Sequence, residues 1–375
     1  RDSARSGSKK GMLWLGVAYL EGSSGFDQEA GGARLWLEKA AEAGSVEAEY
    51  YLGRMHEAGF GVEKDLTKAG QMIGRAAEAG VTDAMMHLAK SYLSGALGET
   101  STDKALELLR KGAGELDLAV FQSALGLLYE GGQGVEKDYE KALFWYDKAA
   151  SGGDPGAYNK LGFFYERGLG VEKDESKAMR YYKSGASAGV AVSMYNVAQM
   201  YDAGKGVDSA NPVAAAKWMQ RAALAGMPLA QNELAVRYRT GKGVLPDVVA
   251  AAAWFERAAR SGLAAAQVNL AQLHEGGEAA IPKNMQSAAE WYFAAASQGH
   301  PQAMYRLGEL YEAGIGTEAD PVRALALYSG AASSGYAPAE KRRDLYAKTL
   351  SEAQRAEAEA LWAKRFKPPV PEEAP

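Results

Sequence analysis

Carboxylates recur along this chain at one position of a regular pattern, at Glu57, Glu130, Glu166, Asp202, Glu275 and Glu312. A close pair of carboxyl groups can carry out acid–base or nucleophilic catalysis. Here each carboxylate belongs to a separate helix, and packed helices lie about 8–10 Å apart. That distance exceeds the separation of about 5.5 Å in retaining glycosidases. We interpret the row as a solvated edge, and an acidic rim that faces a basic partner stays open as the alternative.

Tryptophans form a second row that could stack sugars, at Trp36, Trp145, Trp218, Trp254 and Trp291. The same position holds Met72, Leu108, Tyr181 or Leu327 elsewhere in the chain. Because methionine and leucine cannot replace an aromatic stacking platform but can replace a packing residue, the row predicts packing between repeats.

Metal, phosphate and nucleophile chemistry lack the residues they need. The four histidines have no i, i+4 pair, no His-Glu-x-x-His string occurs, and the chain has no cysteine. The glycine-rich turns lack the Gly-Lys-Ser/Thr ending of a phosphate loop, and no Gly-x-Ser-x-Gly elbow occurs. The sequence therefore predicts no cofactor, no metal and no enzymatic activity.

A strict period explains these rows. Nine anchor residues lie 36 or 37 positions apart, and a glycine or alanine follows each of them. A period of this length predicts stacked repeats. The anchors are Leu15, Leu52, Leu88, Leu125, Leu161, Val197, Leu234, Leu270 and Leu307.

Each period predicts two antiparallel helices joined by a short loop, as the fifth repeat illustrates. Ala157, Leu161 and Tyr165 lie four residues apart and form one stripe of a first helix. Gly168 then ends that helix, and Asp174 is placed to cap the second.

The repeats resemble the Sel1-like family, which is related to the tetratricopeptide repeats. The string AxxxLGxxYxxGxGVxxDxxKAxxWYxKAAxxG is almost complete in residues 129–153. The resemblance implies an all-α, α/α superhelical solenoid of about nine helix-turn-helix repeats with a C-terminal capping helix. Loops at residues 22–32, 95–102 and 278–282 depart from the pattern.

These patterns predict four segments. Residues 1–11 form a flexible flank, residues 12–335 nine repeats, residues 336–366 capping helices, and residues 367–375 a disordered proline-rich tail. Ser351 and Gln354 predict a capping box that opens the last helix.

Charge and hydropathy limit the partners and the location. The net charge of −5 argues against nucleic acid, and no apolar run approaches the roughly 20 residues that cross a bilayer. The chain starts with Arg1, so we expect that a signal peptide has been removed from a periplasmic or secreted protein. A cytoplasmic location stays an alternative, and we expect a monomer.

In tetratricopeptide-like stacks the first helices line a concave groove. The positions two residues before and after each anchor would point into it, and they vary in chemistry between repeats. Semi-buried packing against a neighbouring repeat would explain the same positions. We expect the partner-binding residues to be Tyr50, Arg54, Leu127, Asn159, Phe163, Glu166, Tyr195 and Gln199.

The resemblance implies a non-catalytic scaffold of the bacterial cell envelope that binds another protein through its groove or an edge. The alternative is a periplasmic immunity protein that neutralises a type VI secreted phospholipase. A third group of Sel1-like proteins, proposed to act on β-lactams, has a disulfide in each repeat, which this cysteine-free chain cannot form.

Overall fold

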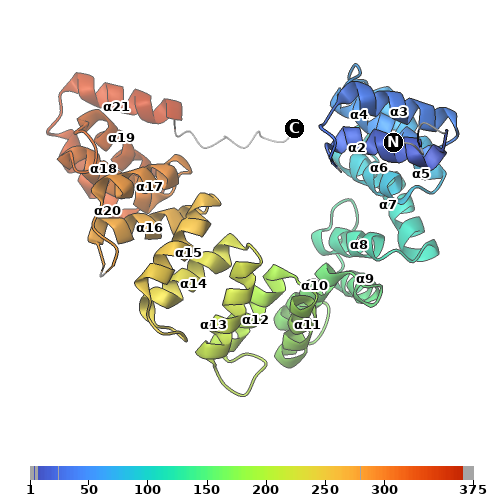
Figure 1. Ribbon diagram of the computed structural model, residues 1–375. Coiled ribbons are helices and arrows are strands. Elements are labelled where there is room, and N and C mark those ends of the chain that lie inside the picture. Colours follow the sequence, from blue (N-terminus) through green and yellow to red (C-terminus); the bar gives the residue numbers. More distant parts are fainter. Residues whose placement is uncertain (1–3, 5–6, 24, 279, 366–375) are drawn as a thin grey trace. The chain divides into compact units, whose positions relative to one another are not determined.

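The computed structural model describes residues 4, 7–23, 25–278 and 280–365, and this part is built from helices without a β-strand (Figure 1). The predicted all-α repeat fold is confirmed. The chain divides into two compact units, Arg1–Tyr181 and Tyr182–Pro375, and each is treated by itself below. No described helix is both long enough and apolar enough to cross a membrane.

Every repeat consists of a first and a second helix. The first helices are α2 (Lys9–Glu21), α4 (Val46–Ala58), α6 (Thr82–Ser94), α8 (Ala119–Gly131), α10 (Pro155–Arg167), α12 (Ala191–Ala203), α14 (Pro228–Thr240), α16 (Ala264–Gly276) and α18 (Pro301–Ala313). The second helices are α3 (Ala30–Glu42), α5 (Leu66–Glu78), α7 (Thr102–Arg110), α9 (Tyr139–Ser151), α11 (Glu175–Ser187), α13 (Pro212–Leu224), α15 (Val248–Arg260), α17 (Met285–Ser297) and α19 (Pro321–Ser333).

The predicted helix boundaries of the fifth repeat follow from its capping residues. Gly168 has φ +70° and its amide donates to Phe164 O, which ends α10 in a left-handed turn. The Asp174 carboxylate accepts a hydrogen bond from the Lys177 amide at 2.7 Å, which satisfies a free donor at the start of α11. Other repeats use the same two devices.

Steps of 37 residues arise where one repeat contains one extra residue. In the first, sixth and eighth repeats the loop between the C-cap of the first helix and the N-cap of the second helix is one residue longer than in the other repeats. These loops run between Gly22 and Glu29, Gly204 and Asn211, and Gly277 and Asn284. In the third repeat the loop has the common length, and the extra residue lies in the second helix.

The third repeat accommodates that residue as a π-helix, η1 (Lys111–Glu115), directly after α7. In other repeats a glycine with positive φ follows the second helix. Here Leu116 stands at that glycine's place with φ −94°, and the positive φ occurs one residue later, at Asp117 (φ +50°). The Asp117 carboxylate accepts a hydrogen bond from Gln122 Nε2 at 2.7 Å. The one repeat that has leucine in place of this glycine is therefore also the repeat in which the second helix changes type.

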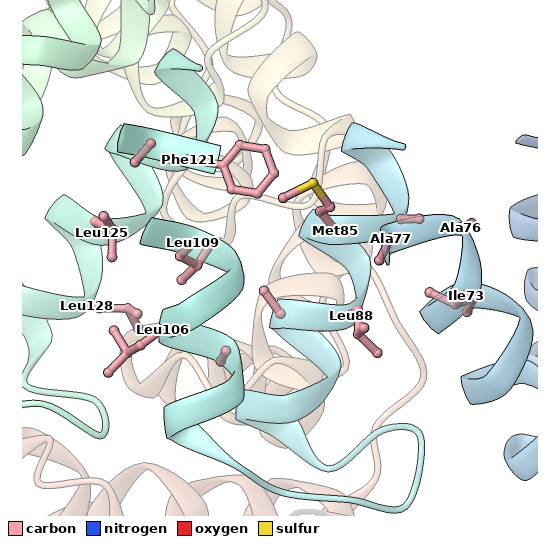
Figure 2. Packing of buried hydrophobic residues seen from close by; sticks show 14 of the residues in the cluster. Ile73, Ala76, Ala77, Met85, Leu88, Leu106, Leu109, Phe121, Leu125 and Leu128 are labelled. Atoms are coloured by element: carbon pink, nitrogen blue, oxygen red, sulfur yellow. The ribbon is translucent and has the colours of Figure 1, made fainter. Parts of the chain in front are cut away.

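Phe121 explains why the π-helix is needed. The equivalent positions in other first helices hold alanine, serine or glycine, whereas Phe121 is fully buried and its ring points toward Met85 (Figure 2). A Cβ atom on Gly112 would lie 2.3 Å from this ring. The bulky side chain therefore fits only because a glycine and a widened helical turn lie opposite it.

The two ends differ in part from the predicted segments. Helix α2 begins at Lys9 with Ser8 as N-cap, three residues before the predicted start of the repeats at residue 12. After the ninth repeat come α20 (Ala337–Ala347) and α21 (Glu352–Arg365). The predicted disordered tail, residues 367–375, lies outside the described residues.

The capping box of the last helix is confirmed. The Ser351 amide donates to Gln354 Oε1 at 3.0 Å, and the Gln354 amide donates to Ser351 Oγ at 3.3 Å. Trp362 of α21 packs on α19, where a Cβ atom on Gly330 would lie 2.3 Å from the indole ring. Helix α21 thereby covers the last repeat.

Candidate functional site

The recurring carboxylates connect consecutive repeats. Glu130, at the end of α8, accepts a hydrogen bond from the Tyr146 hydroxyl of α9 at 2.5 Å and binds Lys160 Nζ of α10 at 2.9 Å. Glu130 thus joins both helices of its own repeat to the next repeat.

The second unit repeats the same arrangement twice. Glu275 accepts from the Tyr292 hydroxyl at 2.7 Å and pairs with Arg306. Glu312 accepts from the Tyr328 hydroxyl at 2.6 Å and pairs with Arg342 of α20. The solvated-edge interpretation is wrong for these three glutamates, because each already has an aromatic and a cationic partner inside the fold.

Tyrosine pairing could have been recognised in the sequence. A tyrosine follows each of these glutamates by 16 or 17 residues, and a lysine or arginine follows it by 30 or 31 residues. The acidic position taken by itself does not show that its tyrosine and cationic partners recur with it.

These tyrosines predict a loss of stability at alkaline pH. Burial, and then the hydrogen bond to the glutamate, raises the pKa of Tyr146, Tyr292 and Tyr328 well above the usual 10. The unfolded chain loses these protons first, so stability is fully present below about pH 10 and falls as pH rises beyond it. We expect the midpoint of urea unfolding, followed by circular dichroism, to fall more steeply above pH 10 than in the triple Tyr→Phe variant at these positions. Equal slopes in both proteins would contradict the assignment.

The carboxylate of the sixth repeat has a different partner. Asp202 of α12 pairs with Arg237 of α14, whose side chain is only 4% exposed, and with Lys242 Nζ at 3.1 Å. At the position of Arg237 other first helices carry residues such as Met55, Met200 and Leu273. A buried cation therefore replaces an apolar core residue here.

Packing by the tryptophans is confirmed, as far as they are described. Trp254 is half-buried and packs against the core clusters of the sixth and seventh repeats. A cation three residues later lies over the ring in several cases, with Arg221 4.4 Å from the Trp218 centroid and Arg257 4.6 Å from the Trp254 centroid. In the described part of the chain, no group of three or more His, Asp or Glu side chains could hold a metal ion.

The predicted groove residues of the first unit differ widely in exposure. Leu127 is 54% exposed and Arg54 is also exposed. Phe163 is half-buried, with the Arg167 guanidinium 5.9 Å from its ring centroid, and Asn159 and Glu166 are half-buried as well. Tyr50, by contrast, is only 7% exposed.

Tyr50 is therefore not a surface residue, contrary to the expectation. It belongs to a core cluster with Leu88 and Ala84, and its ring meets His87 edge-on at 5.9 Å. The anchor spacing places a residue on the first helix but does not show how far the next helix covers it.

The predicted groove residues of the second unit form a hydrogen-bonded network. The Tyr195 hydroxyl donates to Glu233 Oε1 at 2.8 Å, and Gln199 Nε2 donates to the Tyr195 hydroxyl at 2.8 Å. Burial, and then the bond to Glu233, raises the pKa of Tyr195 to about 12. The network joins α12 to α14, so these side chains are held in place before any partner arrives.

An apolar stripe was missed on α8. Val120 lies two turns before Leu127 on the same face, and the two side chains are 52% and 54% exposed. The equivalent positions carry Glu47 and Arg54 on α4, and Asp83 and Lys90 on α6. The signal was available, since comparing both positions across the repeats shows where charge gives way to apolar residues.

Comparison with known families decides what kind of chain this is. The Sel1 repeat matches nine successive segments, residues 9–45, 46–81, 82–114, 119–154, 155–190, 191–227, 228–263, 264–300 and 301–336. The chain belongs to the Sel1 repeat family. Sel1 repeat proteins generally mediate protein–protein interactions, and their scaffold is generally non-catalytic.

Two solved Sel1 repeat structures resemble the chain over almost its full length, and a third resembles about half of it. A protective antigen of uropathogenic Escherichia coli is 26% identical with a TM-score of 0.60, covering 97% of this chain and 93% of the antigen. A Sel1 repeat protein from Oxalobacter formigenes is 29% identical with a TM-score of 0.56, covering 92% and 88%. An immunity protein from Pseudomonas aeruginosa is 24% identical with a TM-score of 0.36, covering 56% and 81%. No curated protein matches the chain.

Proposed function

We propose that this Sel1 repeat protein is a non-catalytic scaffold that binds a protein partner through the surface of α8 and α10. We call Val120, Leu127 and Phe163 the α8–α10 surface. The exposure of Val120 and Leu127 on a first helix is the observation that carries the proposal, because the two preceding first helices, α4 and α6, are charged at these positions. Exposed apolar residues that gather on one face are typical of interaction sites.

The two helices of this surface lie side by side. The ion pair between Glu130 of α8 and Lys160 of α10 connects them at 2.9 Å. Phe163 supplies the aromatic residue that interface hot spots favour, and its neighbours Asn159 and Glu166 supply polar groups at the rim. Arg54 remains a candidate for a further contact on the first unit, and Tyr195 and Gln199 remain candidates on the second unit taken by itself.

We further propose that the scaffold acts in the bacterial cell envelope, in the periplasm or after secretion. The similar E. coli protein is a protective antigen, and this supports a location that antibodies can reach. Protease treatment of intact source cells, with detection by an antibody to the chain, tests the location. Complete protection both in intact cells and after the outer membrane is opened would contradict it.

Substitution of the stripe tests the binding surface. We expect the double variant Val120→Lys and Leu127→Lys to lose at least about tenfold in affinity for the main partner, because two charges would be desolvated in the interface. The partner is first captured from an envelope fraction and identified by mass spectrometry, and its affinity is then measured with purified protein.

The control is Leu245→Lys, which places the same charge on a residue that is 88% exposed outside the α8–α10 surface. Both variants should unfold at the same urea concentration as the wild type. Undiminished binding by the double variant would refute the surface. A main partner with phospholipase activity that the chain inhibits would instead support the immunity role.

A further inference from the structure

The first unit contains an open cavity of about 590 Å³ between α5, α6 and the irregular loop of the third repeat. Its lining includes small residues, together with the charged side chains of Arg75, Glu78 and Glu99. Gly70 and Gly74 face it from α5, Ser91 from α6, and Leu97 and Gly98 from the loop. A cavity of this size is within the range of ligand-binding pockets.

The two glycines are not required by the packing of the chain itself. A Cβ atom on Gly70 would meet only Leu97, at 4.0 Å, and one on Gly74 would meet nothing within 4 Å. Both lie inside a 13-residue helix, where glycine is less favourable than alanine. The effect of the two glycines is therefore to leave open space beside α5.

Ser91 points to a ligand independently of the glycines. It is only 3% exposed, and it takes a position where other first helices carry Met55, Leu128 or Phe164. Within the part of the chain that the structure describes, its hydroxyl has no hydrogen-bond partner. A hydroxyl that lines a cavity and is otherwise buried is stabilised by a partner that enters the cavity.

The same place is filled two repeats later in the same unit. Leu143, Phe164 and Leu169 pack there in one cluster, and they correspond to Gly70, Ser91 and Ala96. Compared with the fifth repeat, this place lacks an aromatic ring and two leucine side chains, while it has gained the side chain of Leu97, where the fifth repeat has Gly170, and one hydroxyl.

We propose that this cavity is a socket for a tyrosine side chain presented by a partner protein. A phenol ring replaces the missing aromatic volume, and its hydroxyl supplies a hydrogen-bond partner for Ser91 Oγ, which an aliphatic or phenylalanine side chain cannot do. Thr67 and Gln71 line the same cavity and can bind the peptide backbone of the entering segment. The socket is a surface separate from the α8–α10 surface and does not depend on it.

The probe is N-acetyl-L-tyrosinamide, titrated into the full chain while the methyl NMR signals of Leu88 and Leu97 are recorded. N-acetyl-L-phenylalaninamide is the matched ligand without the hydroxyl. We expect saturable shifts with a dissociation constant on the order of 1 mM, as suits a ligand of this size. The phenylalanine ligand should bind about 2–10 times more weakly, as for loss of one hydrogen bond.

Two variants separate the socket from a simple gap in packing. The filled variant, Gly70→Leu, Ser91→Phe and Ala96→Leu, carries the chain's own residues from the fifth repeat and should bind at least about tenfold more weakly. Ser91→Ala keeps the cavity open and should lose the preference for tyrosine, which keeps the test valid even if the filled variant misfolds. Val120→Lys with Leu127→Lys should bind the probe as the wild type does.

Three results would overturn the proposal. The first is the absence of saturable shifts below about 20 mM probe, a concentration at which a millimolar site would be almost filled. The second is unchanged binding of the probe by the filled variant. The third is equal binding of the tyrosine and phenylalanine ligands to the wild type. If no saturable shifts occur and the filled variant is more stable than the wild type, the cavity is only a loosely packed region.

Discussion

Phe121→Ala is expected to lower the free energy of unfolding by about 3–5 kcal/mol, the range for removal of a fully buried phenylalanine ring. Phe121 is 0% exposed and joins the core cluster that connects the second, third and fourth repeats. The rigid turn of η1 lies against the ring and is held by Gln122, which also donates to Ala113 O at 3.2 Å. The site therefore cannot collapse easily onto the empty space.

Urea unfolding followed by circular dichroism measures this effect, with Phe144→Ala as the matched control. Phe144 is 53% exposed on the neighbouring α9, and the same truncation there should cost far less, about 1 kcal/mol or below. Adding Gly112→Ala to Phe121→Ala should recover part of the loss, because the new methyl group enters the space left by the ring. A loss below about 1 kcal/mol for Phe121→Ala would contradict this account.

Asp202→Ala is expected to destabilise the second unit by about 3–5 kcal/mol, because it leaves the guanidinium of Arg237 buried without its carboxylate. The Arg237 side chain is 4% exposed and its Nη1 reaches only the carbonyl of Lys242, at 3.4 Å. Its Nε already lacks a hydrogen-bond partner among the described residues. The remaining contacts cannot replace the lost charge pair.

Arg237→Met is the informative counterpart, since Met200 takes the equivalent position on α12. This change restores an apolar core residue, while Asp202 keeps Lys242 as a partner. We expect a clearly smaller loss in the free energy of unfolding than for Asp202→Ala, because the Asp202 carboxylate, 12% exposed, keeps a cationic partner whereas Arg237 would keep none. Thermal and urea unfolding of both variants test the contrast, and a strong loss in Arg237→Met would show that the ion pair itself stabilises the fold.

The fold could be predicted from the sequence because the period of the anchor residues and the residues that end or begin helices agree in every repeat. The anchors, the glycine that ends each first helix and the polar N-cap side chain that starts the second (aspartate, glutamate, asparagine or serine) are local signals that tertiary packing does not override. The π-helix could not be predicted, since it depends on Phe121 and Gly112 meeting across two helices. Leu116 shows where the third repeat departs from the pattern, but not why it does so.

The candidate site was less predictable, for a physical reason. The period shows which helix face a residue lies on, but exposure depends on the side chain next to it in the following repeat. Leu127 and Arg54 are exposed as expected, whereas Tyr50 is covered by α6. The glutamates appeared solvated because their tyrosine and cationic partners are distant in sequence and adjacent only across the stack.

All nine first helices contain 13 residues, although the repeats themselves have two lengths, 36 and 37 residues. Every extra residue is absorbed where it occurs, in a loop or in η1, and is not passed on to the next helix. The gene can therefore gain or lose single codons in these places, or whole repeats by recombination, without changing the register in which the helices of neighbouring repeats pack. Each repeat is in this sense an exchangeable module, and its partner-facing residues can change independently of the stack that holds them.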